Sequence, residues 1–157
     1  MNVLSITGLA PEKAALVAKS LQQLLADFQV YYTNLRGFHW HVRGPQFFTL
    51  HAKFEELYNG AAEHVDDIAE RILQLGYTPE NRFSEYLKVA KIQEKTQVSN
   101  PVEIIPAILE SLRLLIEQER AVLAAADEAG DTVTTDLISD LLDEQEKSIW
   151  MLSAYEG

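Results

Sequence analysis

The most informative segment of this chain is residues 31–58, which reads YYTNLRGFHWHVRGPQFFTLHAKFEELY. Apolar and aromatic residues recur in it at intervals of three and four, the spacing that places side chains on one face of an α-helix. Gly44-Pro45 interrupts the pattern, because glycine suits a left-handed helix cap and proline disfavours helix at the residue before it. The segment therefore predicts two antiparallel helices joined by a tight turn.

The same periodicity continues on both sides of this segment and predicts four long helices. The third is expected to open with a capping box, because Asn100-Pro101 is followed by Glu103. The predicted limits are Pro11 to Gly44, Pro45 to Gly76, Asn100 to Gly130 and Asp131 to Leu152. No strand pattern or internal repeat is present, so we expect an all-α protein, a four-helix bundle in one domain over residues 1–157. The connection 77–99 is expected to contain a short helix over residues 83–92.

Composition narrows the possible functions. The 157 residues are 47% hydrophobic and include no cysteine, so a bound metal would be held by nitrogen and oxygen. No apolar run reaches the roughly 18 residues of a membrane helix, and no basic segment precedes an apolar stretch at the start. A cytoplasmic location is therefore the expectation. The net charge of −11 favours cations and disfavours nucleic acid as partners.

One half of a metal site is predicted at the turn. His39 lies six residues before Pro45 and His51 six residues after it, so the two histidines should face one another at the same height of the hairpin. Glu55 follows His51 by four residues and shares its face of the helix. Imidazole and carboxylate together suit a borderline cation such as iron(II), manganese(II) or zinc(II).

The other half of the site is predicted to come from a second copy of the chain. Asp66 and Glu70 form a second carboxylate pair on the same helix, but 15 residues separate His51 from Asp66, or about 22 Å. A two-fold axis near Gly60-Ala61 would bring the carboxylates of one copy to the histidines of the other, and small residues there would let the helices approach closely. The Glu-x-x-His pairs of di-iron sites inside a single bundle are absent from the sequence.

These residues resemble the Dps family, the ferritin-like mini-ferritins of bacteria. The resemblance covers essentially the whole chain and is carried by four blocks: residues 39–47 (HWHVRGPQF), 50–51 (LH), 54–56 (FEE) and 66–71 (DDIAER). It implies a ferritin-like four-helix bundle that assembles into a hollow homododecamer with ferroxidase sites at its two-fold interfaces. It also implies that iron(II) is oxidised there, preferentially by hydrogen peroxide, and that ferric oxide is stored inside, which protects the cell against oxidative damage.

The resemblance also assigns roles to individual residues. His39, His51 and Glu55 would be iron ligands and catalytic residues from one subunit, and Asp66 and Glu70 those from its partner. Trp40 would lie beside the site and take up stray oxidising equivalents. Two positions depart from the common pattern: Glu55 replaces an aspartate, and so reaches one methylene further and binds directly or through water, and His41 replaces an asparagine, which adds a nitrogen near the entrance. The fourth histidine, His64, is expected to be an ordinary surface or core residue.

Several readings stay open. The fourth helix has four acidic residues at or near its start: Asp131, Asp136, Asp140 and Asp143. The last three share one face of the helix. They either line an ion-attracting pore at a three-fold axis or form a solvated face with acids favoured near the helix N-terminus. Direct DNA binding is not expected, because residues 1–15 contain only Lys13 as a basic residue. The alternative functions are a nucleoid-binding shell protein with a secondary metal site, and a zinc-binding or purely interacting helical bundle.

Overall fold

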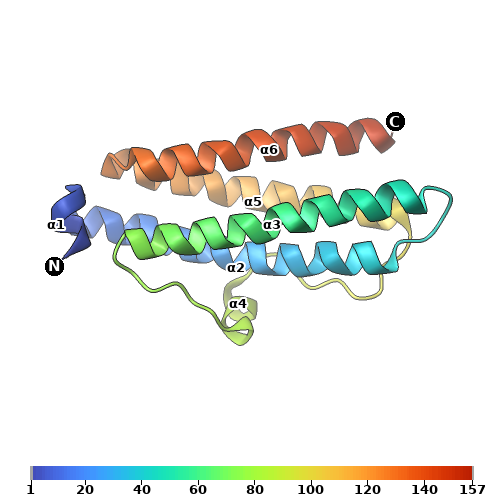
Figure 1. Cartoon of the computed structure of the whole chain (residues 1–157), viewed down its shortest axis with the longest axis horizontal. Coiled ribbons are helices and arrows are strands. Elements are labelled where there is room, and N and C mark those ends of the chain that lie inside the picture. The colour runs from blue at the N-terminus through green and yellow to red at the C-terminus, as the bar shows by residue number, and fades with distance from the viewer. Residues whose placement is uncertain (1, 157) are drawn as a thin grey trace.

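The computed structural model describes residues 2–156, and within them the chain is an antiparallel bundle of four long helices with two short ones (Figure 1). The helices are α1 (Val3–Thr7), α2 (Pro11–His41), α3 (Phe47–Gln74), α4 (Phe83–Val89), α5 (Pro101–Ala129) and α6 (Thr132–Glu156). The pairs α2–α3 and α5–α6 are hairpins, and the long connection that carries α4 returns the chain along the bundle (Figure 1). The predicted all-α four-helix bundle with a short helix in this connection is confirmed.

The turn between α2 and α3 depends on Gly44, whose φ of +121° is one that residues with a Cβ rarely adopt. Phe47 N–H donates to the Gly44 carbonyl over 3.1 Å, and Arg43 N–H donates to the Ser99 carbonyl over 3.0 Å. The first bond closes the turn, and the second fastens it to the residues just before α5. The start of α3 is therefore held at a fixed height beside the end of α2.

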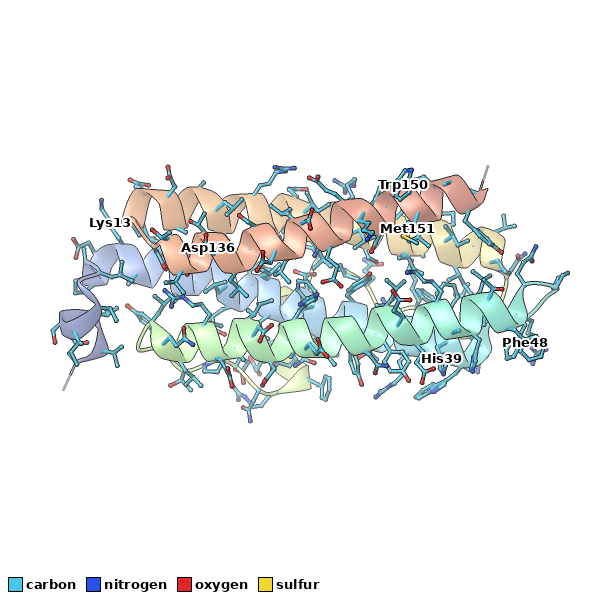
Figure 2. The ribbon with its side chains drawn as sticks, turned by 45° about the horizontal axis from the view of Figure 1, so that its top comes forward. Lys13, His39, Phe48, Asp136, Trp150 and Met151 are labelled. Carbon is cyan, nitrogen blue, oxygen red and sulfur yellow. The ribbon has the colours of Figure 1, made fainter. Side chains whose placement is uncertain are left out.

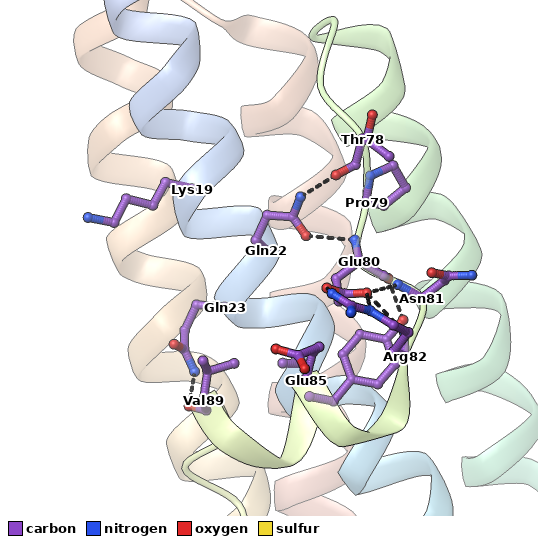
Figure 3. A pocket seen from close by; sticks show the side chains of 12 residues that line it. Lys19, Gln22, Gln23, Thr78, Pro79, Glu80, Asn81, Arg82, Glu85 and Val89 are labelled. Atoms are coloured by element: carbon purple, nitrogen blue, oxygen red, sulfur yellow. Dashed lines mark hydrogen bonds and ion pairs between the residues drawn. The ribbon is translucent and has the colours of Figure 1, made fainter.

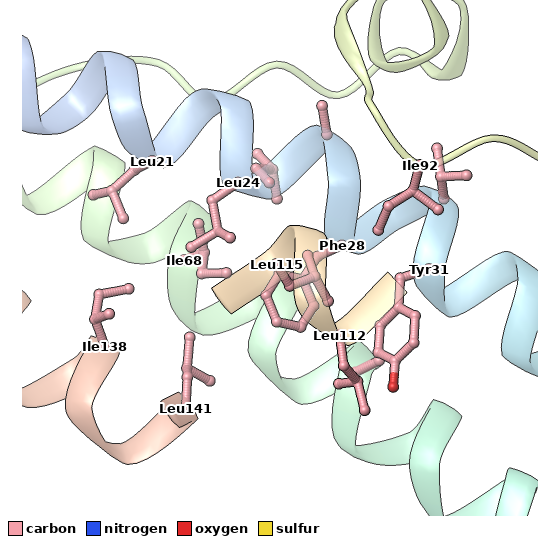
Figure 4. Close-up of a cluster of buried hydrophobic side chains, with 14 of the residues drawn as sticks. Leu21, Leu24, Phe28, Tyr31, Ile68, Ile92, Leu112, Leu115, Ile138 and Leu141 are labelled. Carbon is pink, nitrogen blue, oxygen red and sulfur yellow. The ribbon is translucent and has the colours of Figure 1, made fainter. Parts of the chain in front are cut away.

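The core is one continuous apolar cluster to which all four long helices contribute (Figure 4). Leu21, Leu24 and Phe28 of α2 meet Ile68 of α3 and Leu115 of α5, and each is at most 1% exposed. Burying a side chain of this size contributes on the order of 1.5–3 kcal/mol. The interval of three or four residues between successive core positions is the one used to predict the helices.

Two buried polar side chains of α2 fasten the connection between α3 and α5. Asp27 accepts hydrogen bonds from Lys91 N–H and Ile92 N–H, each over 2.8 Å. Asn34 donates to the Gln93 carbonyl and accepts from Lys95 N–H, each over 2.9 Å. The expected short helix over residues 83–92 is consequently shorter and ends at Val89, because the N–H groups of residues 91 and 92 bond to a carboxylate instead of continuing the helix.

The outer end of the same connection is held by Gln22 of α2, which donates to the Thr78 carbonyl over 2.7 Å and accepts from Glu80 N–H over 3.1 Å (Figure 3). A cavity of about 690 Å³ lies between α2 and this segment. Its lining includes Glu80 and Arg82, which bind each other over 2.7 Å. The connection thus packs along α2 and is held there by these hydrogen bonds.

The observed helix limits otherwise follow the sequence signals closely, with one omission. The predicted start at Pro11 is confirmed, as are the start at Asn100-Pro101 and the end at Gly130. The helix that was not predicted, α1, has five residues, and Asn2 caps it by accepting from Leu4 N–H. A helix this short carries no periodicity that a sequence reading can detect. Within residues 2–156, no helix is both long and apolar enough to cross a membrane.

Candidate metal centre

His39 and His51 lie against one another across the α2–α3 hairpin, as their equal distance from the turn predicts. Their rings are stacked, with centroids 3.7 Å apart and planes 15° from parallel. Figure 2 shows His39 beside α3, at the end of the bundle that carries Phe48. His39 is 8% exposed and His51 is half-buried, so both rings stand at the edge of the core and not in free solution.

A reciprocal pair of hydrogen bonds fixes the orientation of both rings. His39 Nδ1 lies 2.7 Å from the His51 carbonyl oxygen, and His51 Nδ1 lies 2.8 Å from the His39 carbonyl oxygen. A carbonyl can only accept, so each Nδ1 carries the proton and donates. In the neutral rings the lone pair is then on Nε2, the atom that binds a metal. The chain thus prepares two adjacent nitrogen ligands.

Two aromatic side chains hold the histidine pair from either side. The Phe47 ring stacks on His51 at a centroid distance of 4.9 Å, and the Tyr58 ring meets His39 edge-on at 5.3 Å. Partial burial, together with the negative charge of Glu55, raises the pKa of Tyr58. Glu55 itself is exposed, one helical turn after His51 on the same face of α3. The sequence indicated Phe47 and Tyr58 only as packing residues, and their contact with the site is a finding of the structure.

Asp66 and Glu70 lie on the same helix as His51 but far along it, because α3 is continuous from Phe47 to Gln74. The separation along the helix axis is about 22 Å between residues 51 and 66. Both carboxylates are exposed. The structure therefore joins His39 to His51 and leaves Asp66 and Glu70 apart from them.

These residues nevertheless share one face of α3. Intervals of three and four connect an outward stripe made of Phe48, His51, Glu55, Asn59, Ala62, Asp66, Glu70 and Leu73. His51 is half-buried and the other members are exposed. We call this set the α3 stripe. It places both predicted halves of the site on a single surface.

The small residue at the middle of the α3 stripe is Ala62, not the predicted Gly60-Ala61. Ala61 is only 2% exposed and belongs to the chain's own core. A Cβ on Gly60 would lie 3.3 Å from Glu144 Oε1, so this glycine faces α6 of the same chain. The exposed small residue nearest to the predicted position of the axis is therefore Ala62.

The other candidate residues at this end differ in their surroundings. Trp40 is 62% exposed, and its ring lies 5.0 Å from the guanidinium of Arg36. His41 is the exposed last residue of α2. His64 lies elsewhere: its Nε2 is 2.9 Å from Glu144 Oε2, and its ring meets Phe28 edge-on. This agrees with the expectation that His64 is an ordinary packing residue.

The acidic set of α6 is divided by the structure. Asp136, Asp140 and Asp143 are exposed, as both readings of this face require. Asp131 is only 3% exposed, and its Oδ1 binds Arg71 Nη2 over 2.7 Å, so it does not belong to an exposed acidic lining.

Arg71, at the end of the block 66–71, is 8% exposed and makes its ion pair with Asp131 inside the protein. Its guanidinium also donates to Thr134 Oγ1 over 2.8 Å and to Gln74 Oε1 over 2.9 Å, in a buried junction between α3 and the start of α6. Burial alone would raise the pKa of Asp131, but the hydrogen bonds from Thr134 and Arg71 outweigh it and lower that pKa. Within residues 66–71, Asp66 and Glu70 are therefore exposed, whereas Arg71 is buried.

Within residues 2–156, no three His, Asp or Glu side chains of a single chain lie close enough together to hold one metal ion. The chain on its own provides a histidine pair with a carboxylate on the neighbouring turn. Its remaining carboxylate candidates are further along α3.

Comparison with known proteins identifies the family. A family model described as the ferritin-like domain matches residues 18–156. The "DNA protection during starvation protein" of Porphyromonas gingivalis is 50% identical over 154 residues, which cover 98% of this chain and 97% of that protein. The "DNA protection during starvation protein 2" of Bacillus anthracis is 40% identical over 139 residues, 88% of this chain and 95% of that one.

Solved structures agree with these matches. A Dps protein from Vibrio cholerae O1, described as a member of "a broad superfamily of ferritin-like diiron-carboxylate proteins", superposes with a TM-score of 0.93 at 42% identity and covers 95% of this chain and 94% of its own. A Dps protein from Bacillus brevis superposes with a TM-score of 0.89 at 37% identity, covering 93% and 98%. With its bundle, its histidine pair and these relatives taken together, this chain belongs to the Dps family of ferritin-like proteins.

Proposed function

We propose that this protein is a ferroxidase that oxidises iron(II) with hydrogen peroxide and stores the ferric product, at sites shared between two copies of the chain. Membership of the Dps family implies iron storage and protection of the cell. In the proposal, His39, His51 and Glu55 of one subunit face Asp66 and Glu70 of its partner. Iron is the substrate and the stored cargo.

The observation that carries the proposal is the reciprocal bonding of the histidine pair. Both Nδ1 atoms are occupied by carbonyl oxygens of the opposite helix, so both Nε2 atoms are free to bind iron without any change in the fold. Holding a ligand in one orientation removes the cost of ordering it when iron arrives. Neutral nitrogen donors and carboxylates are a donor set that suits iron(II).

The α3 stripe supports sharing of the site. When two copies cross antiparallel between Asn59 and Ala62 of the stripe, residues on either side of that point exchange places, so each His51 approaches the partner's acidic end of the stripe. Every such pair contains two equivalent sites. The carboxylates offset the positive charge of the bound ions and stabilise iron(III), because hard oxygen ligands favour the higher oxidation state.

The proposed reaction balances with two iron ions for each peroxide. Two iron(II) ions each lose one electron, the O–O bond of hydrogen peroxide breaks, and two protons complete two molecules of water. Delivery of both electrons at one site avoids the release of hydroxyl radical. The role of this chain is to hold the two ions side by side and to set their charge with its own carboxylates.

Trp40 is proposed to take up oxidising equivalents that escape this reaction. It reaches the site through a series of contacts: its ring lies against Arg36, Arg36 lies 5.2 Å from the Tyr32 ring, and Tyr32 meets Tyr58 at 6.0 Å. Tyr58 in turn contacts His39. An oxidised ring on this path is therefore close to the site but outside it.

The proposal extends to assembly and location. We propose a cytoplasmic homododecamer in which Asp136, Asp140 and Asp143 line an entrance for iron(II). The matched relatives are named for DNA protection, and we propose that protection here results from removal of iron and peroxide. A chain with a net charge of −11 has no electrostatic reason to bind DNA directly. A gel shift with plasmid DNA at low salt is expected to show no complex.

The proposed activity is tested by loading the purified protein with iron(II) without oxygen and adding hydrogen peroxide. The expected result is rapid formation of ferric absorbance on a dodecamer-sized particle, with two iron(II) ions consumed for each peroxide and no spin-trapped hydroxyl radical. Oxidation no faster than in buffer would overturn the proposal. Tight zinc binding without iron oxidation would instead favour the zinc-binding alternative.

A further inference from the structure

Two carboxyl groups are completely buried in the bundle, and their surroundings differ. Asp27 and Glu119 are both 0% exposed. Asp27 receives four N–H donors: two backbone groups on one oxygen, and Gln23 and Gln118 on the other, each over 2.8 Å. Both oxygens are satisfied, as an ionised carboxylate requires. Glu119 receives a single donor, Gln145 Nε2 of α6, over 2.5 Å.

Two polar atoms of the Glu119–Gln145 pair have no hydrogen-bond partner. They are Glu119 Oε2 and Gln145 Oε1, one from each residue of a pair already joined by a bond between their other atoms. Gln145 is 6% exposed, so neither atom is freely solvated. Buried polar atoms without partners cost about 1–3 kcal/mol each, and both of these atoms are acceptors unless one of them carries a proton.

We propose that Glu119 is a neutral carboxylic acid in the folded subunit, and that its Oε2–H donates to Gln145 Oε1. A carboxylic acid and a primary amide then form a closed ring of two hydrogen bonds between α5 and α6. One proton satisfies both remaining atoms. The core of this protein thus contains a proton-binding site, held by two side chains that take no part in the iron chemistry.

Titratable groups from α2, α3 and α6 surround the pair. Tyr31 of α2 is buried, and burial together with the negative charge of Glu144 raises its pKa. Glu144 belongs to α6 and His64 to α3, and these two bind each other.

The one cation close to Glu119 is the next residue on α5, Arg120. Its guanidinium points to solvent and pairs with Glu146 over 3.2 Å, with both side chains more than half exposed. Burial is the dominant influence and raises the pKa of Glu119 to about 8, against smaller opposing contributions from Gln145 and Arg120. Glu119 is accordingly protonated at neutral pH.

The consequence is a dependence of stability on pH. The ordinary pKa of a glutamate is 4.5 and that of Glu119 in the fold is about 8, so between these values the folded state holds a proton that the unfolded state has released. The contribution to stability is complete below the lower value and decreases as pH rises toward the upper one. Between them, the folding equilibrium constant falls about tenfold per pH unit from this group alone.

The first test is infrared spectroscopy of the assembled protein. At pH 6.5 we expect one carboxylic-acid C=O band, which disappears as pH is raised past 8 and is absent from Glu119→Gln at every pH. Glu117→Gln is the matched control, because Glu117 is an exposed glutamate on the same helix. No carboxylic-acid band in the unmodified protein at pH 6.5 would overturn the proposal, whether or not the variant folds.

The second test is thermal stability across the same range. Glu119→Gln retains two hydrogen-bonding groups but cannot titrate, so its melting temperature should decrease less between pH 6.5 and pH 9 than that of the unmodified protein. The Glu117→Gln control should follow the unmodified protein. Equal pH dependence in all three would contradict a proton bound at Glu119. Iron oxidation is not used in either test.

Discussion

The polar side chains at the two ends of α3 differ in how completely they are hydrogen-bonded within the chain. At the C-terminal end, every donor of Arg71 discussed above is used inside the chain, by Asp131, Thr134 and Gln74. At the N-terminal end, the histidine pair uses only one nitrogen of each ring and leaves the other free. The difference separates a structural junction, which is closed within one chain, from the proposed half-site, where each ring keeps one nitrogen available for iron.

Breaking the closed junction should have the largest effect. Arg71→Ala leaves Asp131 buried without its cation, and loss of one partner of a buried pair costs about 3–5 kcal/mol. Because the hydrogen bonds from Thr134 and Arg71 lower the pKa of Asp131 in spite of its burial, its stabilisation is present above the ordinary value of 3.8 and is lost as pH falls through the lowered pKa. Denaturant unfolding at pH 7 and at low pH measures both effects, and the deficit of the variant should be smaller in acid.

Arg113→Ala is the matched control for that variant. Arg113 pairs with Glu110 on the surface of α5, where both side chains are more than half exposed. Exposed pairs contribute about 0–1 kcal/mol. Equal destabilisation by the two substitutions would show that the junction at the end of α3 is not closed in the way the structure indicates.

A positive charge near the centre of the α3 stripe should prevent two subunits from pairing through it. Ala62→Arg places two cations against each other in the proposed antiparallel pair, and like charges in contact cost several kcal/mol, here about 3 kcal/mol. Each subunit should still fold, because Ala62 is exposed in the single chain. Light scattering should show smaller particles with unchanged helical circular dichroism. Assembly of normal size would exclude a pair in which the two Ala62 residues lie close together.

Removing one histidine ligand of the proposed half-site should strongly slow iron oxidation and leave the fold intact. His51→Ala removes one Nε2, while the backbone carbonyl of residue 51 can still orient His39. We expect peroxide-driven iron oxidation to fall about 100-fold, a loss at the upper end of that for perturbed metal ligation. His41→Ala, at an exposed position just outside the pair, is the control and should oxidise iron at a rate close to normal. The reverse order of the two rates would move the site to His41.

The smallest effect is expected at the start of α5. Asn100 caps this helix by accepting from Val102 N–H over 3.1 Å, and Asn100→Ala should cost about 1 kcal/mol. Substitution of Glu103 by Ala should cost less, because the observed cap bond is made by Asn100. A larger loss at Glu103 would restore the full capping box that the sequence predicts.

Sequence reasoning succeeded where one local rule determines the outcome. Glycine and proline fixed the ends of the long helices, and the equal spacing from Pro45 predicted the facing histidines. It failed where the answer depends on which face of a helix meets another element. Arg71 and Asp131 carry the same charges whether they face solvent or each other, and only the packing of α3 against α6 shows that they are buried together. The burial of Glu119 has the same origin, since Glu117 on the same helix is an exposed glutamate and only the packing of α5 distinguishes the two.

The shared site is tested most directly by mixing two inactive chains. His51→Ala lacks the histidine half and Asp66→Ala the carboxylate half, so particles of either variant alone should be inactive. In a mixed pair, one site loses both halves and the other keeps both, so equal co-assembly should restore about a quarter of the normal sites. Recovery of iron oxidation near that level, on particles purified by tags on both chains, is the predicted result. Mixed particles as inactive as their parents would contradict a site built from two copies.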